Sequence, residues 1–240
     1  MATIAPHARV FCAADTDSLS SALDLAREIK GAVGGIKLGL EFFGACGPAG
    51  VTAVRAEGLP VFLDLKLYDI PNTVAHAVRA LTPLGVDFMT LHASGGPAML
   101  QAAVAAATAA ATEFNVARPQ LLAVTVLTSM DKSDLEAIGV AADPAEQVLR
   151  LARMAKAAGV DGVVCSAHEI KALRAELGPD FILMVPGIRP MGADHGDQKR
   201  VMTPAEAVAA GADHLVIGRP ITQAADRKAA ARAIATELGS

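Results

Sequence analysis

The sequence has few cysteines, and none of them is spaced for a disulfide framework or a zinc site. Among 240 residues there are only three, Cys12, Cys46 and Cys165, which are far apart and form no C-x-x-C pair. Such an odd, scattered set is typical of a protein kept in a reducing compartment. We therefore expect a cytoplasmic protein in which Cys12 and Cys165, both inside apolar runs, are small core residues.

The sequence also has no excess of basic charge. It holds 21 Lys and Arg against 25 Asp and Glu, which gives a formal net charge of −4, and the basic residues are scattered along the chain. Proteins that bind nucleic acid usually gather Lys and Arg into a patch or stripe. We therefore expect no nucleic-acid partner.

Long apolar runs and low-complexity linkers are absent as well. Residues 1–9 contain no apolar core of signal-peptide length, and the Ala-rich stretch 102–111 is too short and too weakly apolar to span a bilayer. No Gly- or Ser-rich segment divides the chain, and 52% of its residues are hydrophobic. We expect residues 1–240 to form a single domain that is neither exported nor embedded in a membrane.

What the sequence does contain is a repeated alternation of buried strands and amphipathic helices. Between short apolar runs lie segments with helical spacing, such as Leu19, Leu23 and Ala26. Eight apolar runs are predicted to be strands: 10–13, 36–38, 61–63, 88–91, 121–126, 163–165, 182–185 and 215–217. Strands buried on both faces and separated by helices favour a parallel sheet.

The helix ends in the sequence are regular. Residues 203–206 read as a capping box, and Asp143 followed by Pro144 marks another helix start. Gly85, Gly159 and Gly211 each end a helical segment just before a predicted strand. Eight such units predict an α/β protein with a closed (β/α)8 TIM barrel, whereas a doubly wound open sheet is the alternative.

Three charged residues follow the third predicted strand, where the active site of a barrel is built. The strand period of two puts Asp64 and Lys66 on one face, and Asp69 comes just past the strand. Burying three charges at the end of an apolar strand lowers the stability of the fold by roughly several kcal/mol. Such a cost is typical of charges that have a function. We therefore predict that they are catalytic, although an internal ion pair that only fills the barrel end is the alternative.

Two further charged residues belong to the first two predicted strands. Asp15 ends the first strand, where it could either join a binding site or cap the following helix. Lys37 interrupts the apolar run 35–39 of the second strand. A lysine there needs an anion or a carboxylate partner, unless it extends its ammonium to solvent at the barrel end.

The last two predicted strands lead into glycine and arginine. Arg189 follows Gly187, and Arg219 follows Gly218. In barrels this position commonly binds phosphate, because glycine lets the backbone approach and arginine grips two oxygens. The polar stretch 189–201 is predicted to be a functional lid.

Histidines are given no catalytic role. His92 ends the fourth predicted strand, but no second ligand stands at metal-binding spacing, so a hydrogen-bonded structural role is favoured. His76, His168 and His195 fall in helix or loop positions and are expected to be solvated. The sequence therefore suggests no metal site.

The run at 64–73 has the form D-x-K-x-x-D-I-P-N-T. With it the chain resembles the orotidine 5′-phosphate decarboxylase family, of the short single-function bacterial type, over essentially its whole length. Supporting matches are Asp15, Lys37 and the segments 126–130, 186–190, 196–198 and 217–220. The resemblance implies decarboxylation of orotidine 5′-monophosphate to uridine 5′-monophosphate, the last step of pyrimidine synthesis, without metal or organic cofactor.

The resemblance also implies a role for each matching residue. Lys66 would protonate the carbon that loses carbon dioxide, with Asp64 as its anchor. Asp69 and Thr73 would enter the neighbouring subunit's site, which makes the working unit a homodimer. The substrate-binding residues implied are Asp15 and Lys37 for the ribose, Thr128 for the pyrimidine, Gln198, Gly218 and Arg219 for the phosphate, and Arg189 as support for the phosphate pocket.

Two other functions fit parts of the same pattern. A magnesium-dependent sugar-phosphate decarboxylase or aldolase of the same superfamily shares the D-x-K-x-x-D spacing. Those relatives have an acidic metal ligand where this chain has Lys37, and a lysine there would oppose a second cation. A non-catalytic barrel that only binds nucleotide phosphate is the other alternative, but it would have no need of Lys66 as a proton donor.

Overall fold

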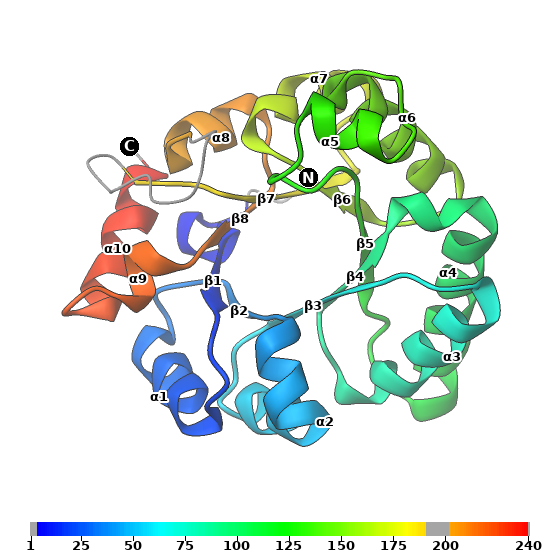
Figure 1. The fold of residues 1–240 in the computed structure, drawn as a ribbon. Coiled ribbons are helices and arrows are strands. Elements are labelled where there is room, and N and C mark those ends of the chain that lie inside the picture. Colours follow the sequence, from blue (N-terminus) through cyan, green and yellow to red (C-terminus); the bar gives the residue numbers. More distant parts are fainter. Residues whose placement is uncertain (1–3, 191–201, 240) are drawn as a thin grey trace.

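The computed structural model describes residues 4–190 and 202–239. Eight parallel strands form a closed barrel in chain order (Figure 1). The strands are β1 Val10–Ala14, β2 Gly35–Leu38, β3 Val61–Leu67, β4 Phe88–His92, β5 Gln120–Val124, β6 Gly162–Val164, β7 Ile182–Pro186 and β8 His214–Ile217. The predicted (β/α)8 barrel is therefore confirmed, and because β1 pairs with both β2 and β8 the open-sheet alternative is excluded.

Helices surround the barrel and cover its outer face (Figure 1). The α-helices are α1 Leu19–Ile29, α2 Leu40–Ala56, α3 Pro71–Leu81, α4 Gly96–Phe114, α5 Lys132–Ala137, α6 Pro144–Ala157, α7 Ile170–Leu177, α8 Pro204–Ala210, α9 Arg219–Thr222 and α10 Arg227–Glu237. Short 3-10 helices are η1 Pro6–Arg9, η2 Thr82–Leu84, η3 Ala93–Gly95 and η4 Ala167–Glu169. None of the helices in the described ranges is long and apolar enough to cross a membrane.

The predicted helix ends are present. The Thr203 side chain and Glu206 form the expected capping box at the start of α8, with Pro204 at its first position. Gly85, Gly159 and Gly211 have φ angles of 66°, 85° and 115°. Because L-residues rarely adopt this left-handed region, glycine lets the chain turn directly from each helix toward the next strand.

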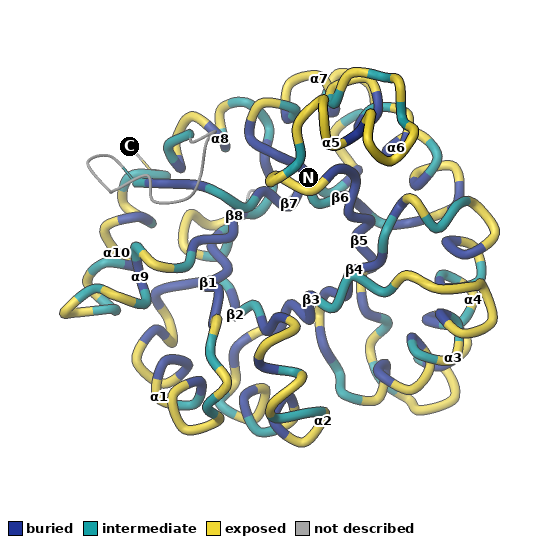
Figure 2. The backbone as a smooth tube through the Cα atoms, in the orientation of Figure 1, coloured by how far each residue is buried: buried dark blue, intermediate teal, exposed yellow. Residues whose placement is uncertain are grey.

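The core consists of two clusters of buried side chains, a large one and a smaller one that includes Phe11, Phe62 and Phe88. Figure 2 shows that buried residues run along the strands of the barrel. The side of α1 that faces the barrel differs from the one predicted, because Leu19 is 37% exposed and Leu23 is only partly buried. The buried residues of α1 are Ala22, Leu25, Ala26 and Ile29. These residues form an apolar face over two full turns of α1, and the two alanines allow close packing against the barrel. The helix therefore buries this face and not the one marked by Leu19 and Leu23.

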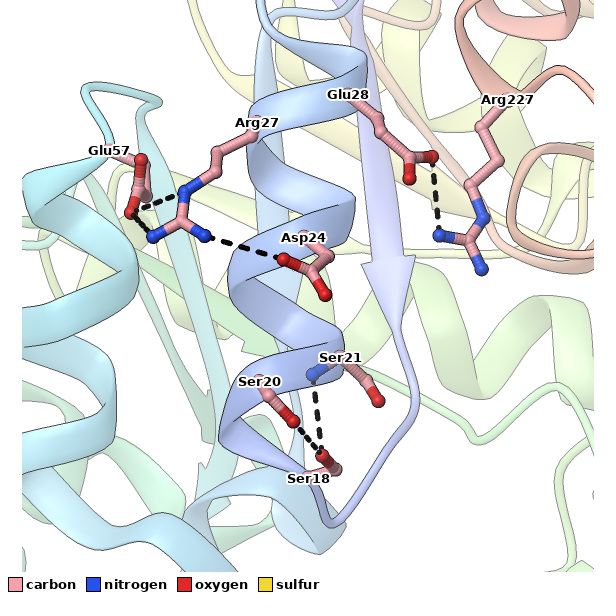
Figure 3. A network of polar contacts seen from close by, with 8 residues as sticks. All are labelled: Ser18, Ser20, Ser21, Asp24, Arg27, Glu28, Glu57 and Arg227. Atoms are coloured by element: carbon pink, nitrogen blue, oxygen red, sulfur yellow. Dashed lines mark hydrogen bonds and ion pairs between the residues drawn. The ribbon is translucent and has the colours of Figure 1, made fainter.

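Ion pairs hold the outer face of α1 to its neighbours (Figure 3). Arg27 pairs with Glu57 at the end of α2, with 2.7 Å between Nη2 and Oε1. On the other side, Glu28 pairs with Arg227 at the start of α10. These side chains are all at least partly exposed to solvent, so each pair contributes at most about 1 kcal/mol to stability.

Aromatic rings close the N-terminal end of the barrel. Phe11, Phe62 and Phe88 pack edge to face with one another, and the Phe11 ring lies 5.3 Å from the ring of His214. His214 Nδ1 is buried and has no hydrogen-bond partner among the described residues. Among the described residues these rings form a packed floor at the N-terminal end of the barrel, opposite the strand ends where a ligand is expected.

The buried ring of His214 predicts a pH-dependent stability. Burial lowers the pKa of His214 from 6.5 to about 4. Between these values the unfolded chain binds a proton that the folded chain does not, so the free energy of unfolding falls as the pH drops from 6.5 toward 4. At pH 5 the free energy of unfolding is lower than at neutral pH by about 2 kcal/mol because of His214.

The variant His214→Phe should lack this loss. We expect its free energy of unfolding, relative to the wild type, to rise by about 2 kcal/mol between pH 7.5 and pH 5. Urea unfolding at the two pH values measures it, with His168→Gln, a change at an exposed histidine, as the control. An equal pH effect in wild type and His214→Phe would contradict the assignment.

Candidate active site

Two adjoining cavities open at the C-terminal ends of the strands, and both are lined by Lys37, Pro186 and Val216. The narrow cavity has a volume of about 220 Å³. It is lined mainly by apolar side chains, with Asp64, Lys66 and Thr128 as the polar groups that remain. The wide cavity, of about 500 Å³, is lined by Asp15, Gly187, Arg189, Gly218, Arg219 and Gln223, among others.

The carboxylate of Asp64 is the centre of the polar network in the narrow cavity. Its Oδ2 accepts a hydrogen bond from Lys66 Nζ at 2.8 Å and lies 3.6 Å from Lys37 Nζ. Its Oδ1 accepts a hydrogen bond from the Thr90 hydroxyl at 3.0 Å. The side chains of Asp64 and Lys37 are each only 12% exposed. One buried carboxylate is thus held by two ammonium groups and one hydroxyl.

Lys66 reaches Asp64 by a different backbone path from the one predicted. Between the pairs Leu63–Met89 and Leu67–Leu91, β3 advances four residues while β4 advances two. Lys66 has a φ of 51° in this irregular stretch, so the regular alternation expected for Asp64 and Lys66 does not hold. The ammonium meets the carboxylate across this shift in register, which we call the bulge, and not through the strand period of two.

Lys37 lines both cavities, and Asp15 lines the wide one beside it. Lys37 Nζ is 3.4 Å from Asp15 Oδ1, in addition to its contact with Asp64. Asp15 does not cap α1, because Ser18 is the N-cap residue of that helix. Lys37 does not merely extend toward solvent, because it is shared between two carboxylates. The structure therefore brings both residues into the site.

Asp69 and Thr73 lie apart from this network. Neither lines the two cavities, and both are exposed. Asp69 Oδ1 accepts a hydrogen bond from the backbone N–H of Ile70 at 2.6 Å. Of the three charges predicted to act together, the structure joins Asp64 and Lys66 within one chain but leaves Asp69 at the surface.

The wide cavity offers donors for an anion. Arg189, which is 8% exposed, and Arg219 both line it, together with Lys37. Gly218 precedes α9 and leaves room where a side chain would come 3.4 Å from the Cβ of Ala13. Guanidinium groups beside an open backbone suit the oxygens of a phosphate group.

The remaining predicted residues differ in where they fall. Thr128 is in the site, because it lines the narrow cavity. Gln198 and His195 lie outside the described residues, as does most of the stretch 189–201 that was predicted to be a lid. His92 lines neither cavity; its ring rests 5.5 Å from that of Tyr68, and burial, aided by the charge of Lys66, lowers its pKa.

The two buried cysteines are inert as nucleophiles. Burial raises the pKa of Cys12 to about 12 and that of Cys165 well above 9.0. Both thiols therefore stay protonated at neutral pH. Cys165 was predicted to be a core residue, and it is buried, but it also lines the narrow cavity.

The sequence interpretation missed three site residues. Thr90 contacts Asp64, and Thr222 and Gln223 line the wide cavity. A signal for Thr90 was present, because it interrupts the apolar run of β4 as Lys37 interrupts that of β2. Thr222 and Gln223 gave no such signal, because only the fold of the short helix α9 turns them toward the cavity.

The donor set does not resemble a metal centre. Within residues 4–190 and 202–239, no three His, Cys, Asp or Glu side chains gather as metal ligands. A divalent cation bound at Asp64 would also face the ammonium groups of Lys37 and Lys66. What the arrangement can do instead is present a fixed cation and a transferable proton in a largely apolar cavity beside an anion-binding cavity.

The chain is similar to known proteins over nearly its whole length. The model of the orotidine 5′-phosphate decarboxylase / HUMPS family matches residues 8–234. The chain is 54% identical to orotidine 5′-phosphate decarboxylase of Paramagnetospirillum magneticum, covering 96% of this chain and 98% of the relative. It is 56% identical to the enzyme of that name from Rhodospirillum rubrum, covering 95% and 93%.

A solved structure gives the same result for the fold. The crystal structure of orotidine 5′-phosphate decarboxylase from Lactobacillus acidophilus superposes with a TM-score of 0.85 at 39% identity. The match covers 96% of this chain and 99% of the other. The likeness therefore extends over the whole barrel and is not confined to one motif.

The shared carboxylate predicts a large difference in stability between two similar substitutions. Asp64→Asn removes the charge that separates the ammonium groups of Lys37 and Lys66, so we expect it to lower the free energy of unfolding by about 3 kcal/mol. Asp69→Asn, at an exposed position, should change it by less than about 0.5 kcal/mol. Urea unfolding at one fixed protein concentration measures both, and equal effects would contradict the network.

Proposed function

Because the chain belongs to the orotidine 5′-phosphate decarboxylase / HUMPS family, we infer that it converts orotidine 5′-monophosphate to uridine 5′-monophosphate and carbon dioxide. This reaction is the last step of pyrimidine synthesis. The observation that carries the inference is the Asp64–Lys66 pair in a narrow cavity that adjoins a wide, arginine-lined one. A substrate with a small ring at one end and a phosphate at the other matches this division.

The two cavities suggest how the substrate binds. The phosphate occupies the wide cavity, where Arg219 and the backbone at Gly218 contact it and Arg189 supports the pocket. The pyrimidine occupies the narrow cavity near Thr128. Lys37, which lines both cavities, and Asp15 beside it hold the ribose hydroxyls. Gln198, assigned to the phosphate by resemblance, completes the proposed set.

Lys66 carries the chemical step. When the bond between C6 and the carboxylate breaks, carbon dioxide leaves and the electron pair stays on C6 in the ring plane, where the ring π system cannot delocalise it. The ammonium of Lys66, held by Asp64, stabilises this pair and then transfers a proton to C6. Solvent returns a proton to Lys66 after the product leaves.

We propose that this step needs neither metal nor organic cofactor. The fixed ammonium takes the place of an electron sink. The magnesium-dependent alternative is not favoured, because the relatives at 54% and 56% identity are named orotidine 5′-phosphate decarboxylase. A barrel that only binds nucleotide would not need an ammonium opposite its phosphate cavity.

Asp69 and Thr73 are proposed to act in the site of a second copy. The stretch 68–73 is exposed throughout, and within it Tyr68 is 61% and Ile70 is 66% exposed. Apolar side chains this exposed, at the mouth of a barrel, are suited to burial against a partner. A homodimer would bury them and would bring the Asp69 carboxylate toward the partner's substrate.

We further propose that residues 1–240 act as one decarboxylase domain in the cytoplasm. The family model covers residues 8–234 without a break between domains. Cys12, Cys46 and Cys165 are free thiols, as a reducing compartment would keep them.

Replacing Lys66 separates binding from chemistry. We expect Lys66→Ala to bind uridine 5′-monophosphate within about threefold of the wild type but to lose turnover by at least about 10³-fold, because it lacks the proton donor. Loss of ultraviolet absorbance measures turnover, and calorimetry measures binding. Wild-type turnover should be unchanged after EDTA treatment. Near-wild-type turnover by Lys66→Ala, or loss of wild-type turnover in EDTA, would contradict the mechanism.

Replacing Arg219 tests the phosphate cavity. Arg219→Ala should lower kcat/KM by about 10²-fold, chiefly through a higher KM, because a charged hydrogen-bonding group to the phosphate is lost. Arg232→Ala, at an exposed position on α10, is the matched control and should leave the kinetics unchanged. Equal kinetics for Arg219→Ala and Arg232→Ala would contradict the proposal that the substrate phosphate binds in the wide cavity.

Mixing two inactive variants tests the shared site. If Asp69 serves the partner's site, a mixed dimer of Lys66→Ala and Asp69→Ala holds one intact site and one doubly altered site. An equal mixture, after subunit exchange, should regain about one quarter of wild-type activity, because about half of the dimers are mixed. No recovery despite exchange would show that Asp69 acts in its own subunit.

A further inference from the structure

We propose that Thr90 is a positioning residue for the decarboxylation, because its hydroxyl fixes both the Asp64 carboxylate and the backbone of Lys66. The inference rests on the function proposed for this site. Thr90 lies in the middle of β4 and is fully buried. It lines neither cavity, so it acts on the substrate only through these two residues.

The direction of both hydrogen bonds is fixed by chemistry. The backbone N–H of Lys66 can only donate, so Thr90 Oγ1 accepts from it at 2.8 Å. An ionised carboxylate can only accept, so the same hydroxyl donates its one proton to Asp64 Oδ1 at 3.0 Å. Thr90 therefore joins the two residues in a single chain of hydrogen bonds.

The hydrogen bond from the Thr90 hydroxyl fixes the orientation of the Asp64 carboxylate. With Oδ1 held by Thr90, the other oxygen faces the ammonium groups of Lys66 and Lys37, at 2.8 Å and 3.6 Å. Without the hydroxyl the carboxylate could rotate and exchange its oxygens between these partners. The position of the Lys66 ammonium would then be less well defined.

The hydrogen bond from the Lys66 N–H to Thr90 holds Lys66 in an unfavourable backbone conformation. Lys66 has a φ of 51°, which L-residues adopt rarely, and it lies in the bulge where β3 and β4 lose their regular register. Thr90 is the residue of β4 that lies between the two register pairs flanking the bulge. Its side chain accepts the hydrogen bond that the Lys66 N–H donates in this irregular stretch.

Substitution by valine isolates this role. Valine has nearly the shape of threonine, so it keeps the packing of β4 but leaves Asp64 Oδ1 and the Lys66 N–H without their partner. Serine keeps the hydroxyl and should keep both bonds. Thr82 provides a matched control, because it too is fully buried and its hydroxyl donates to a backbone carbonyl, that of Val78.

The test compares the kinetics of Thr90→Val, Thr90→Ser and Thr82→Val with orotidine 5′-monophosphate as substrate. Thr90→Val should lower kcat by about 10–100-fold while KM stays within about threefold, because a displaced Lys66 impairs chemistry more than binding. Thr90→Ser and Thr82→Val should both keep kcat within about threefold of the wild type. Thr90→Ala serves in place of Thr90→Val if the latter does not fold.

A second measurement does not depend on turnover. Amide hydrogen exchange followed by NMR should show faster exchange of the Lys66 N–H in Thr90→Val than in wild type or Thr82→Val. Wild-type kcat in Thr90→Val, an equal loss of kcat in Thr90→Ser, or unchanged exchange would each overturn the positioning role. Absence of turnover in the wild-type protein would instead contradict the proposed function.

Discussion

The constraint on which this site depends is the burial of one carboxylate between two ammonium groups. Asp64 ends the apolar part of β3, where an unpaired charge would be strongly unfavourable. Lys66 and Lys37 offset that cost, and the Thr90 hydroxyl satisfies the second oxygen. The two ammonium groups and the hydroxyl all contact the Asp64 carboxylate. The Lys66 ammonium, which is proposed to act on the substrate, is therefore in position before the substrate binds.

The barrel supplies what this network needs on either side. Below it, the edge-to-face rings of Phe11, Phe62 and Phe88 close the floor, and Phe62 is also part of the narrow cavity. Above it, the ends of β7 and β8 carry Arg189 and Arg219 into the wide cavity. An apolar cavity strengthens the electrostatic effect of a fixed ammonium, and the arginine-lined cavity beside it is the one we propose for the phosphate.

Much of this arrangement could be predicted from the sequence, because it depends on local chemistry. The apolar runs predicted all eight strands, and the glycines predicted the turns that follow the helices at Gly85, Gly159 and Gly211. The bulge at Lys66 could not be predicted, because register is decided between two strands and not within one. The surface position of Asp69 also lies beyond the reach of strand periodicity, because the chain leaves β3 before it.

The most direct test of the account is a crystal structure of the wild-type protein with uridine 5′-monophosphate bound. The account predicts that C6 of the pyrimidine lies within hydrogen-bonding distance of Lys66 Nζ, about 3–3.5 Å, in the narrow cavity. It also predicts that the phosphate contacts Arg219 in the wide cavity. A pyrimidine bound with C6 turned away from Lys66, or a phosphate bound outside the wide cavity, would contradict it.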